Sequence, residues 1–89
     1  DNGVYIEKTS AQVKTTFEFV KDASSDVLLA VALYETDGRL VAIDYKNCGL
    51  AVGFNSENLI IQTDSLTYTK VKAFVWDEKL TPLHNVTEN

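Results

Sequence analysis

The sequence predicts an all-β fold, an antiparallel β-sandwich of about seven strands. Bulky side chains recur at every second position in the most regular segments, which is the repeat of a strand with one buried face. An Asp37-Gly38 pair separates two β-prone segments, as the turn of a β-hairpin does. A helical repeat is nowhere sustained over the roughly ten residues that a helix needs. Short strands and turns within 89 residues favour a sandwich.

Two segments are expected to supply most of the core. Residues 13–19 form the clearest strand, because one side of it is mostly apolar and the other polar. Its core-facing positions are Val13, Thr15, Phe17 and Phe19. Residues 26–34 are apolar on both sides, which predicts a central strand, although a buried helix is the alternative. The β-branched residues and flanking turn residues favour the strand. Its larger side chains, expected in the core, are Val27, Leu29, Val31 and Leu33.

The Asp37-Gly38 pair is expected to connect this central strand to another at residues 39–45. A two-residue loop of this composition suits a type I′ turn, whose central residues take positive φ angles. Glycine reaches such angles without steric cost, so the turn depends on Gly38.

The middle of the chain is harder to divide into strands. Apolar residues alternate over residues 50–54, and a second β-prone run covers residues 59–62. Polar residues separate these two runs. Asp64-Ser65 marks a further turn.

A late strand, residues 70–76, has two contrasting faces. Its core face is expected to carry Val71, Ala73 and Val75. The opposite face carries Lys70, Lys72, Phe74 and Trp76. Val4 and Ile6 indicate a short first strand. Residues 80–84 form either an edge strand or a packed tail, since Pro82 cannot donate to an interior ladder.

Length and charge limit the classes of partner. With 89 residues the chain has material for one core, and we expect a single module, residues 1–89, excised from a larger multidomain protein. The formal net charge of -5 repels a phosphate backbone, which argues against nucleic acid. No apolar run approaches the roughly 20 residues of a transmembrane helix, so we expect no membrane insertion. Neighbouring domains of the parent chain are the expected partners.

Reactive side chains are few. Cys48 and His84 are the only residues of their types, which excludes an intrachain disulfide, a multi-cysteine zinc site and a histidine-rich metal site. A catalytic triad would have to use His84, and Cys48 is expected to be a small buried hydrophobe. Glu35, Asp37 and Asp77-Glu78 lie in expected turns, where calcium binding is an alternative without a regular loop pattern. We expect no catalytic residue, no metal site and no cofactor.

Phe74 and Trp76 are the candidate ligand-binding residues. If their face of the strand is open, Trp76 can stack on a sugar ring, which would make the chain a polysaccharide-binding module. In the alternative, which we favour, Leu80 to Leu83 fold back over the indole, because a domain this small needs its aromatic side chains for stability.

Two short patterns resemble a known class of module. They are Val31-Ala32-Leu33-Tyr34 with Asp37-Gly38-Arg39-Leu40-Val41, and Val71-Lys72-Ala73-Phe74-Val75-Trp76-Asp77 with Leu80-Thr81-Pro82-Leu83. Both are similar to small immunoglobulin-like or fibronectin-type-III-like modules of secreted clostridial and related Firmicutes surface proteins and polysaccharide-processing enzymes. The resemblance covers Ala11 to Leu83 and departs from the pattern around Lys46 to Asn58, where Cys48 and Gly53 interrupt a connection that is usually plainer. The strand count between Lys46 and Asn58 therefore stays open. It implies an immunoglobulin-like sandwich with a non-catalytic structural or interaction role in a secreted or cell-surface protein, and it carries no ligand-binding residues to transfer.

Overall fold

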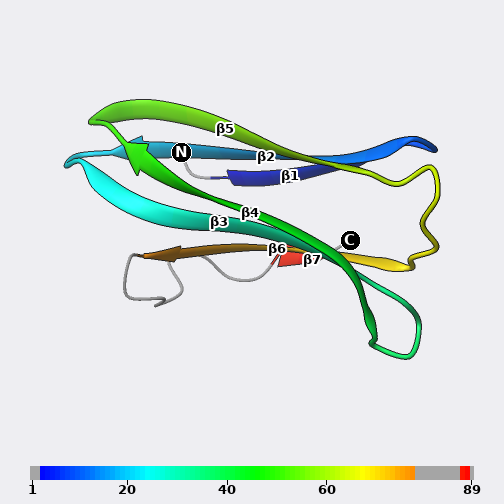
Figure 1. Ribbon diagram of the computed structural model, residues 1–89. Coiled ribbons are helices and arrows are strands. Elements are labelled where there is room, and N and C mark those ends of the chain that lie inside the picture. Colours follow the sequence, from blue (N-terminus) through cyan, green and yellow to red (C-terminus); the bar gives the residue numbers. More distant parts are fainter. Residues whose placement is uncertain (1–2, 78–86, 89) are drawn as a thin grey trace.

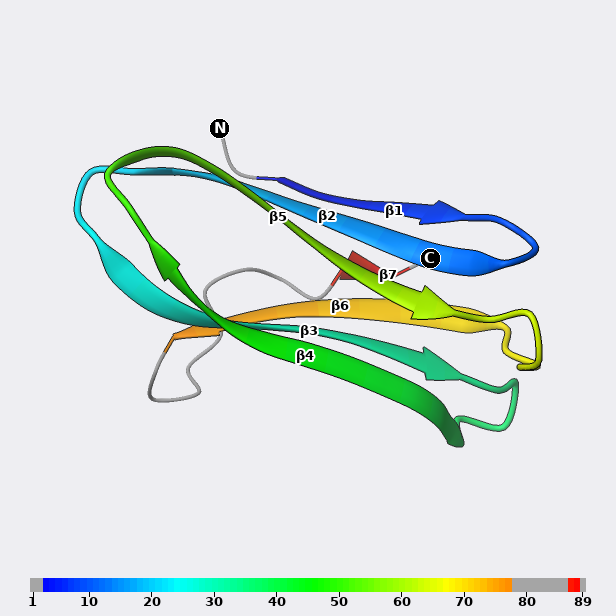
Figure 2. The same cartoon turned by 45° about the horizontal axis from the view of Figure 1, so that its top comes forward.

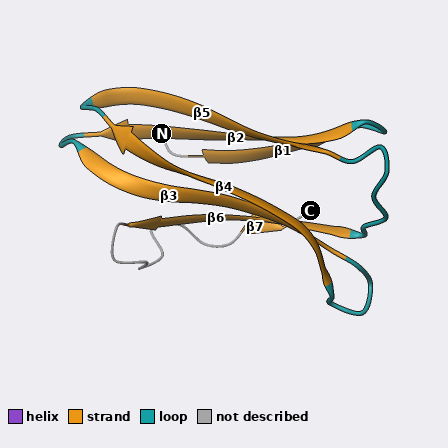
Figure 3. Ribbon diagram, in the orientation of Figure 1, coloured by secondary structure: helices purple, strands orange, loops and turns teal. Residues whose placement is uncertain are grey.

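The computed structural model describes residues 3–77 and 87–88, which form two antiparallel β-sheets packed face to face (Figure 1). No helix occurs within these residues (Figure 3). The strands are β1 (Gly3–Lys8), β2 (Gln12–Lys21), β3 (Ser25–Tyr34), β4 (Leu40–Leu50), β5 (Gly53–Gln62), β6 (Lys70–Asp77) and the two-residue β7 (Thr87–Glu88). The all-β prediction and the two-layer antiparallel architecture are therefore confirmed.

The strand order is β1-β2-β5 in one sheet and β4-β3-β6-β7 in the other. Six strands are full strands, not the expected seven, because β7 contributes only two residues to the described part of the chain. The chain changes sheets three times, between β2 and β3, between β4 and β5, and between β5 and β6. Figure 2 shows β3 in the middle of the larger sheet, with β4 on its outer side and β6 on the other.

The core lies between the two sheets and follows the alternation of the sequence. On β2 the four positions expected to face inward are all buried, and Val13, Thr15 and Phe17 have no exposed surface. On β3 and β6 the expected core residues are likewise buried: Val27, Leu29, Val31, Leu33, Val71, Ala73 and Val75. Burial of apolar surface at about 25 cal/mol per Å² is what holds the sheets together.

The β3–β4 hairpin has a longer turn than the sequence suggested. The Gly38 N–H donates to the Glu35 carbonyl at 2.9 Å, and the Glu35 N–H donates to the Arg39 carbonyl at 2.9 Å. The loop is therefore three residues, 36–38, closed by a four-residue turn in which Gly38 comes last. Gly38 has a φ of 87°, so its positive φ is confirmed, while the two-residue type I′ assignment was wrong. A turn followed by a left-handed glycine is the usual three-residue hairpin loop.

The middle of the chain forms two long strands where shorter runs were expected. β4 continues through Leu50, the chain turns at residues 51–52, and β5 then runs without a break through its polar residues. On this edge strand Ser56 and Asn58 face the exposed outer side, while Asn55 and Glu57 are on the inner side and each has a polar partner. Asn55 also fixes the turn, since its side chain accepts from the Ala51 N–H at 3.0 Å and donates to the Ala51 carbonyl at 2.8 Å.

Two smaller predictions are confirmed, and a third concerns residues that the structure does not describe. β1 contains Val4 and Ile6, and residues 63–66 form a turn with a Leu66 N–H to Thr63 carbonyl hydrogen bond of 3.0 Å. The segment 80–84, whose role as edge strand or tail was left open, lies outside the described residues, as does His84.

Candidate functional site

The outer side of the larger sheet, facing away from the core, carries a group of aromatic and aliphatic side chains from three strands. The antiparallel register places Trp76 and Asn47 on either side of Leu28, and Phe74 and Tyr45 on either side of Ala30. Directly paired residues of an antiparallel ladder point to the same side of the sheet. We call this surface the aromatic face, and its residues are Leu28, Ala30, Ala32, Ile43, Tyr45, Phe74 and Trp76.

Phe74 and Trp76, the two residues singled out in the sequence, lie next to each other on β6. Their ring centroids are 5.3 Å apart and the ring planes are tilted by 33°. Both side chains are half-buried. Aromatic pairs at this separation gain about 0.5–1.5 kcal/mol beyond their buried area, so part of the role of this pair is to stabilise the sheet.

Alanines form the centre of the aromatic face. Ala30 and Ala32 point to the outer side of the sheet, yet only 2% and 0% of their surface is exposed. Tyr45 on β4 and Phe74 on β6 flank Ala30 at a separation of two strand spacings, about 10 Å. Neighbouring side chains therefore cover the alanines of β3, and the exposed part of the aromatic face lies on β4.

The middle of strand β4, residues 43–46, has an inverted pattern, with apolar side chains outside and charged ones inside. Ile43 and Tyr45 are 55% and 62% exposed. Asp44 and Lys46 are half-buried and occupy the same side of the sheet as the core residues of β3. Lys46 Nζ lies 2.9 Å from Glu57 Oε1, so this ion pair joins the edges of the two sheets.

Ile43 and Tyr45 were not recognised from the sequence as surface residues. Their alternation with Asp44 and Lys46 was visible, but such a pattern ordinarily means that the apolar side faces the core. A signal was nevertheless present in the partner strand. Because β3 is apolar on both sides, one of its two faces had to continue as an apolar outer surface.

The other end of β6 is polar. Lys72 Nζ lies 5.2 Å from the centre of the Tyr34 ring, which is within the range of a cation–π contact. Glu88 Oε1 and Oε2 lie 3.4 Å from Lys70 Nζ and 3.9 Å from Lys72 Nζ, respectively. Exposed pairs of this kind contribute little stability, and they mark the boundary of the aromatic face.

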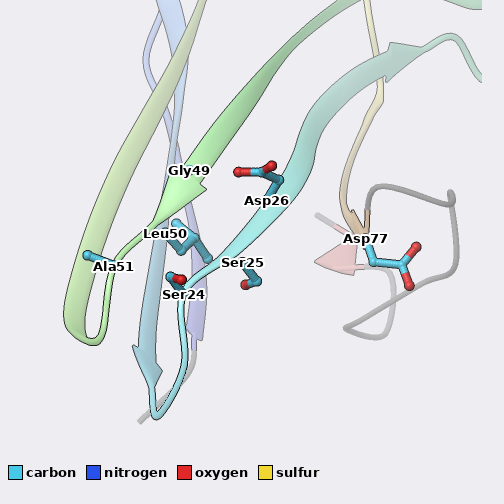
Figure 4. Close-up of a pocket in the computed structure, with 7 residues that line it drawn as sticks. All are labelled: Ser24, Ser25, Asp26, Gly49, Leu50, Ala51 and Asp77. Carbon is cyan, nitrogen blue, oxygen red and sulfur yellow. The ribbon is translucent and has the colours of Figure 1, made fainter.

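A pocket of about 730 Å³ lies at the end of the sandwich that holds the β4–β5 turn (Figure 4). Its lining is Ser24, Ser25, Asp26, Gly49, Leu50, Ala51 and Asp77. The carboxylates of Asp26 and Asp77 point away from each other (Figure 4), so they do not form the facing pair that glycoside hydrolysis requires. Among the residues that the structure describes, the lining contains neither a histidine nor a lysine to activate a serine hydroxyl.

Cys48 lies on the inner side of β4, half-buried against the core. Burial raises the pKa of its thiol, and the negative charge of Glu57 raises it further. A raised pKa leaves the thiol protonated at neutral pH, which makes it a poor nucleophile. Across residues 3–77 and 87–88, no three His, Cys, Asp or Glu side chains gather in a way that could hold a metal ion.

A comparison with known protein families gave no match, and a comparison with curated proteins gave none either. Within the described part of the chain, no helix has the length and apolar character to cross a membrane.

Proposed function

We propose that this chain is a non-catalytic structural and interaction module of a larger, secreted or cell-surface bacterial protein, and that it makes contact through the exposed β4 side of the aromatic face. The observation that supports this proposal most is the exposure of Ile43 and Tyr45 on one strand face, beside the apolar rows of β3 and β6. Contiguous apolar side chains at a surface are typical of protein interaction sites.

The strand order supports an immunoglobulin-like or fibronectin-type-III-like assignment for the sandwich. Constant-type immunoglobulin domains place their first, second, fourth and fifth strands in one sheet and their third, sixth and seventh in the other. Here β1-β2-β5 and β3-β6-β7 follow that division, whereas β4 departs from it by joining the second sheet beside β3. Sandwiches of this class frequently act as spacers or contact modules between neighbouring domains of cell-surface proteins.

The proposal is tested by nuclear magnetic resonance on the ¹⁵N-labelled chain, alone and joined to the neighbouring domains of its parent protein. We expect amide shifts to change on β4 and on the outer side of β6, and to stay constant on the outer side of β2. Hydrolysis of polysaccharide or ester substrates by the purified chain, if one substitution at Asp26 or Asp77 abolishes it, would contradict the non-catalytic role.

Carbohydrate binding at Phe74 and Trp76 is a second candidate. The observation that favours it is their place beside Tyr45 on one sheet face, because several aromatic rings on one face suit a sugar chain. The half-burial of both residues favours the structural role instead. Titration of Trp76 fluorescence with plant and cell-wall glycans separates the two, and we expect no shift.

A further inference from the structure

Strand β4 is a long, open edge. It has 11 residues and stands at the end of its sheet, and among the described residues it pairs only with β3. The far side of an edge strand presents N–H and C=O groups that can accept another strand. On β4 the Tyr45 N–H donates to Asp44 Oδ1 at 2.9 Å, so an added strand that bonds to this N–H must displace that bond. Its exposed outer face is apolar, so it lacks the charged side chains that usually discourage such pairing.

The inner face of β4 carries a different feature, the two half-buried charges Asp44 and Lys46, of which Lys46 is already paired with Glu57 of its own chain at 2.9 Å. A charge that points inward on an edge strand normally opposes the addition of another strand, because the addition would bury the charge further. The opposition disappears when the incoming strand supplies an opposite charge at the paired position. The charges therefore select among the registers in which a strand can be added.

A second copy of β4 supplies those opposite charges in one register. When two copies pair antiparallel with Tyr45 opposite Tyr45, Asp44 of each copy lies opposite Lys46 of the other, on the same side of the sheet. Registers centred on Asp44 or on Lys46 would instead place like charges opposite each other. In this register even-numbered residues lie opposite even-numbered ones and odd opposite odd. The core-facing side chains of both copies therefore lie on the same side of the joined sheet.

The same register continues the aromatic face across the junction. The exposed Tyr45 rings of the two copies meet at the symmetry axis, and Ile43 lies opposite Asn47 of the second copy. We propose that a second copy of this chain binds along β4, antiparallel and centred on Tyr45, so that the two larger sheets form one continuous sheet. This inference rests on the proposed interaction role and names the partner for it.

Disulfide cross-linking tests the register. Tyr45→Cys in a Cys48→Ser background places two thiols opposite each other at Cα separations of about 4.5–5.5 Å, which a disulfide spans. Ile43→Cys in the same background is the matched control, since it is exposed on the same side of the same strand but lies roughly 13 Å from its own copy. We expect mild oxidation to give a covalent dimer of the Tyr45→Cys variant and at most a trace of dimer with Ile43→Cys.

A second variant keeps the tyrosine. Ala42 lies opposite Cys48 of the second copy in this register, so Ala42→Cys in the otherwise natural chain is expected to form two disulfides per dimer. Within one chain these positions are about 20 Å apart along the strand and cannot bond to each other. Circular dichroism of each variant establishes that it retains the β fold.

Charge reversal tests the selection of register. Adding Asp44→Lys to the Tyr45→Cys variant places two lysines opposite each other twice per dimer, and we expect the cross-linking rate to fall about tenfold. Asp26→Lys, the same change at an exposed position of β3, is expected to leave the rate unchanged. Equal cross-linking at positions 43 and 45, or a rate that Asp44→Lys does not change, would overturn the inference.

Sedimentation completes the test with the unmodified chain. Because a single strand pairing gives an interface at the small end of the usual range, we expect a reversible dimer that grows with concentration. A chain that stays monomeric at every concentration, and whose Tyr45→Cys variant gives no covalent dimer, refutes self-pairing. The interaction role itself is judged separately, by the amide shifts measured with the neighbouring domains.

Discussion

Trp76→Ala and Tyr45→Ala form a matched pair that separates the structural part of the aromatic face from its accessible part. Both changes remove an aromatic ring from the outer side of the same sheet, on strands that flank β3. Any change in intrinsic strand preference is therefore similar for the two. The difference between them reports burial, since Trp76 is half-buried and Tyr45 is 62% exposed.

The expected magnitudes follow from burial. A fully buried Trp→Ala change costs about 3–5 kcal/mol, so the half-buried Trp76, with its contact to Phe74, should cost about 2–3 kcal/mol. Tyr45→Ala should cost less than about 1 kcal/mol. In urea, where small proteins have slopes near 1 kcal/mol per M, Trp76→Ala shifts the midpoint by roughly 2–3 M.

The assay is urea unfolding followed by far-ultraviolet circular dichroism, because Trp76→Ala removes the only tryptophan and with it the fluorescence signal. Equal costs for the two variants would refute the division of the aromatic face. A Trp76→Ala cost below about 0.5 kcal/mol, together with lost binding to a glycan that the unmodified chain binds, would favour the carbohydrate-binding candidate.

Three further predictions concern single positions. Gly38→Val should lower stability by about 1–2 kcal/mol, measured by thermal unfolding, because a side chain is strained at the φ of 87°. An added Cβ meets no atom within 4 Å, so the strain comes from the backbone, and Gly38→Asn should cost less. Asn55→Ala should cost about 1–2 kcal/mol, since it removes the hydrogen bonds to Ala51 that hold the β4–β5 turn; an unchanged urea midpoint would show that the turn holds without them. The pKa of the Cys48 thiol is raised in the folded chain, so the folded chain keeps a proton that the unfolded chain loses. The contribution of Cys48 to stability is therefore present below the ordinary thiol pKa and is lost as the pH rises through the folded pKa. Alkylation by iodoacetamide should accordingly need a higher pH in the folded chain than in urea, and identical pH profiles would show that burial does not affect the thiol.

The strands that contact the core were predictable because burial leaves a two-residue repeat in the sequence. Phe17, Leu29 and Val75 occupy the positions that this repeat assigned to them. The β4–β5 region was not predictable in the same way. Its boundary depends on hydrogen bonds from the Asn55 side chain to a turn four residues earlier, and such local bonding does not appear in a hydrophobic pattern.

The candidate site was only partly predictable. The sequence placed Phe74 and Trp76 on the outer side of a strand, where they lie. It did not show that Tyr45 belongs to the same face, because that depends on the order β4-β3-β6, which brings together segments about 30 residues apart in the chain. The alternation on β4 suggested instead that Tyr45 faces the core. The charged residues of β4 are on the inner side because they face β5 across the open side of the sandwich.

The three links between the sheets differ in length, and this difference has a consequence for how the sandwich opens. The β2–β3 and β4–β5 links, residues 22–24 and 51–52, lie at the same end of the molecule (Figure 1). The β5–β6 link, residues 63–69, lies at the other end and is held by backbone hydrogen bonds from Thr63 to Ala11 and from Thr69 to Tyr34. Two short covalent links act as a hinge, so the sheets can separate only by parting first at the β5–β6 end. Amide hydrogen exchange should therefore form a gradient along the strands, fastest beside residues 63–69 and slowest near the hinge.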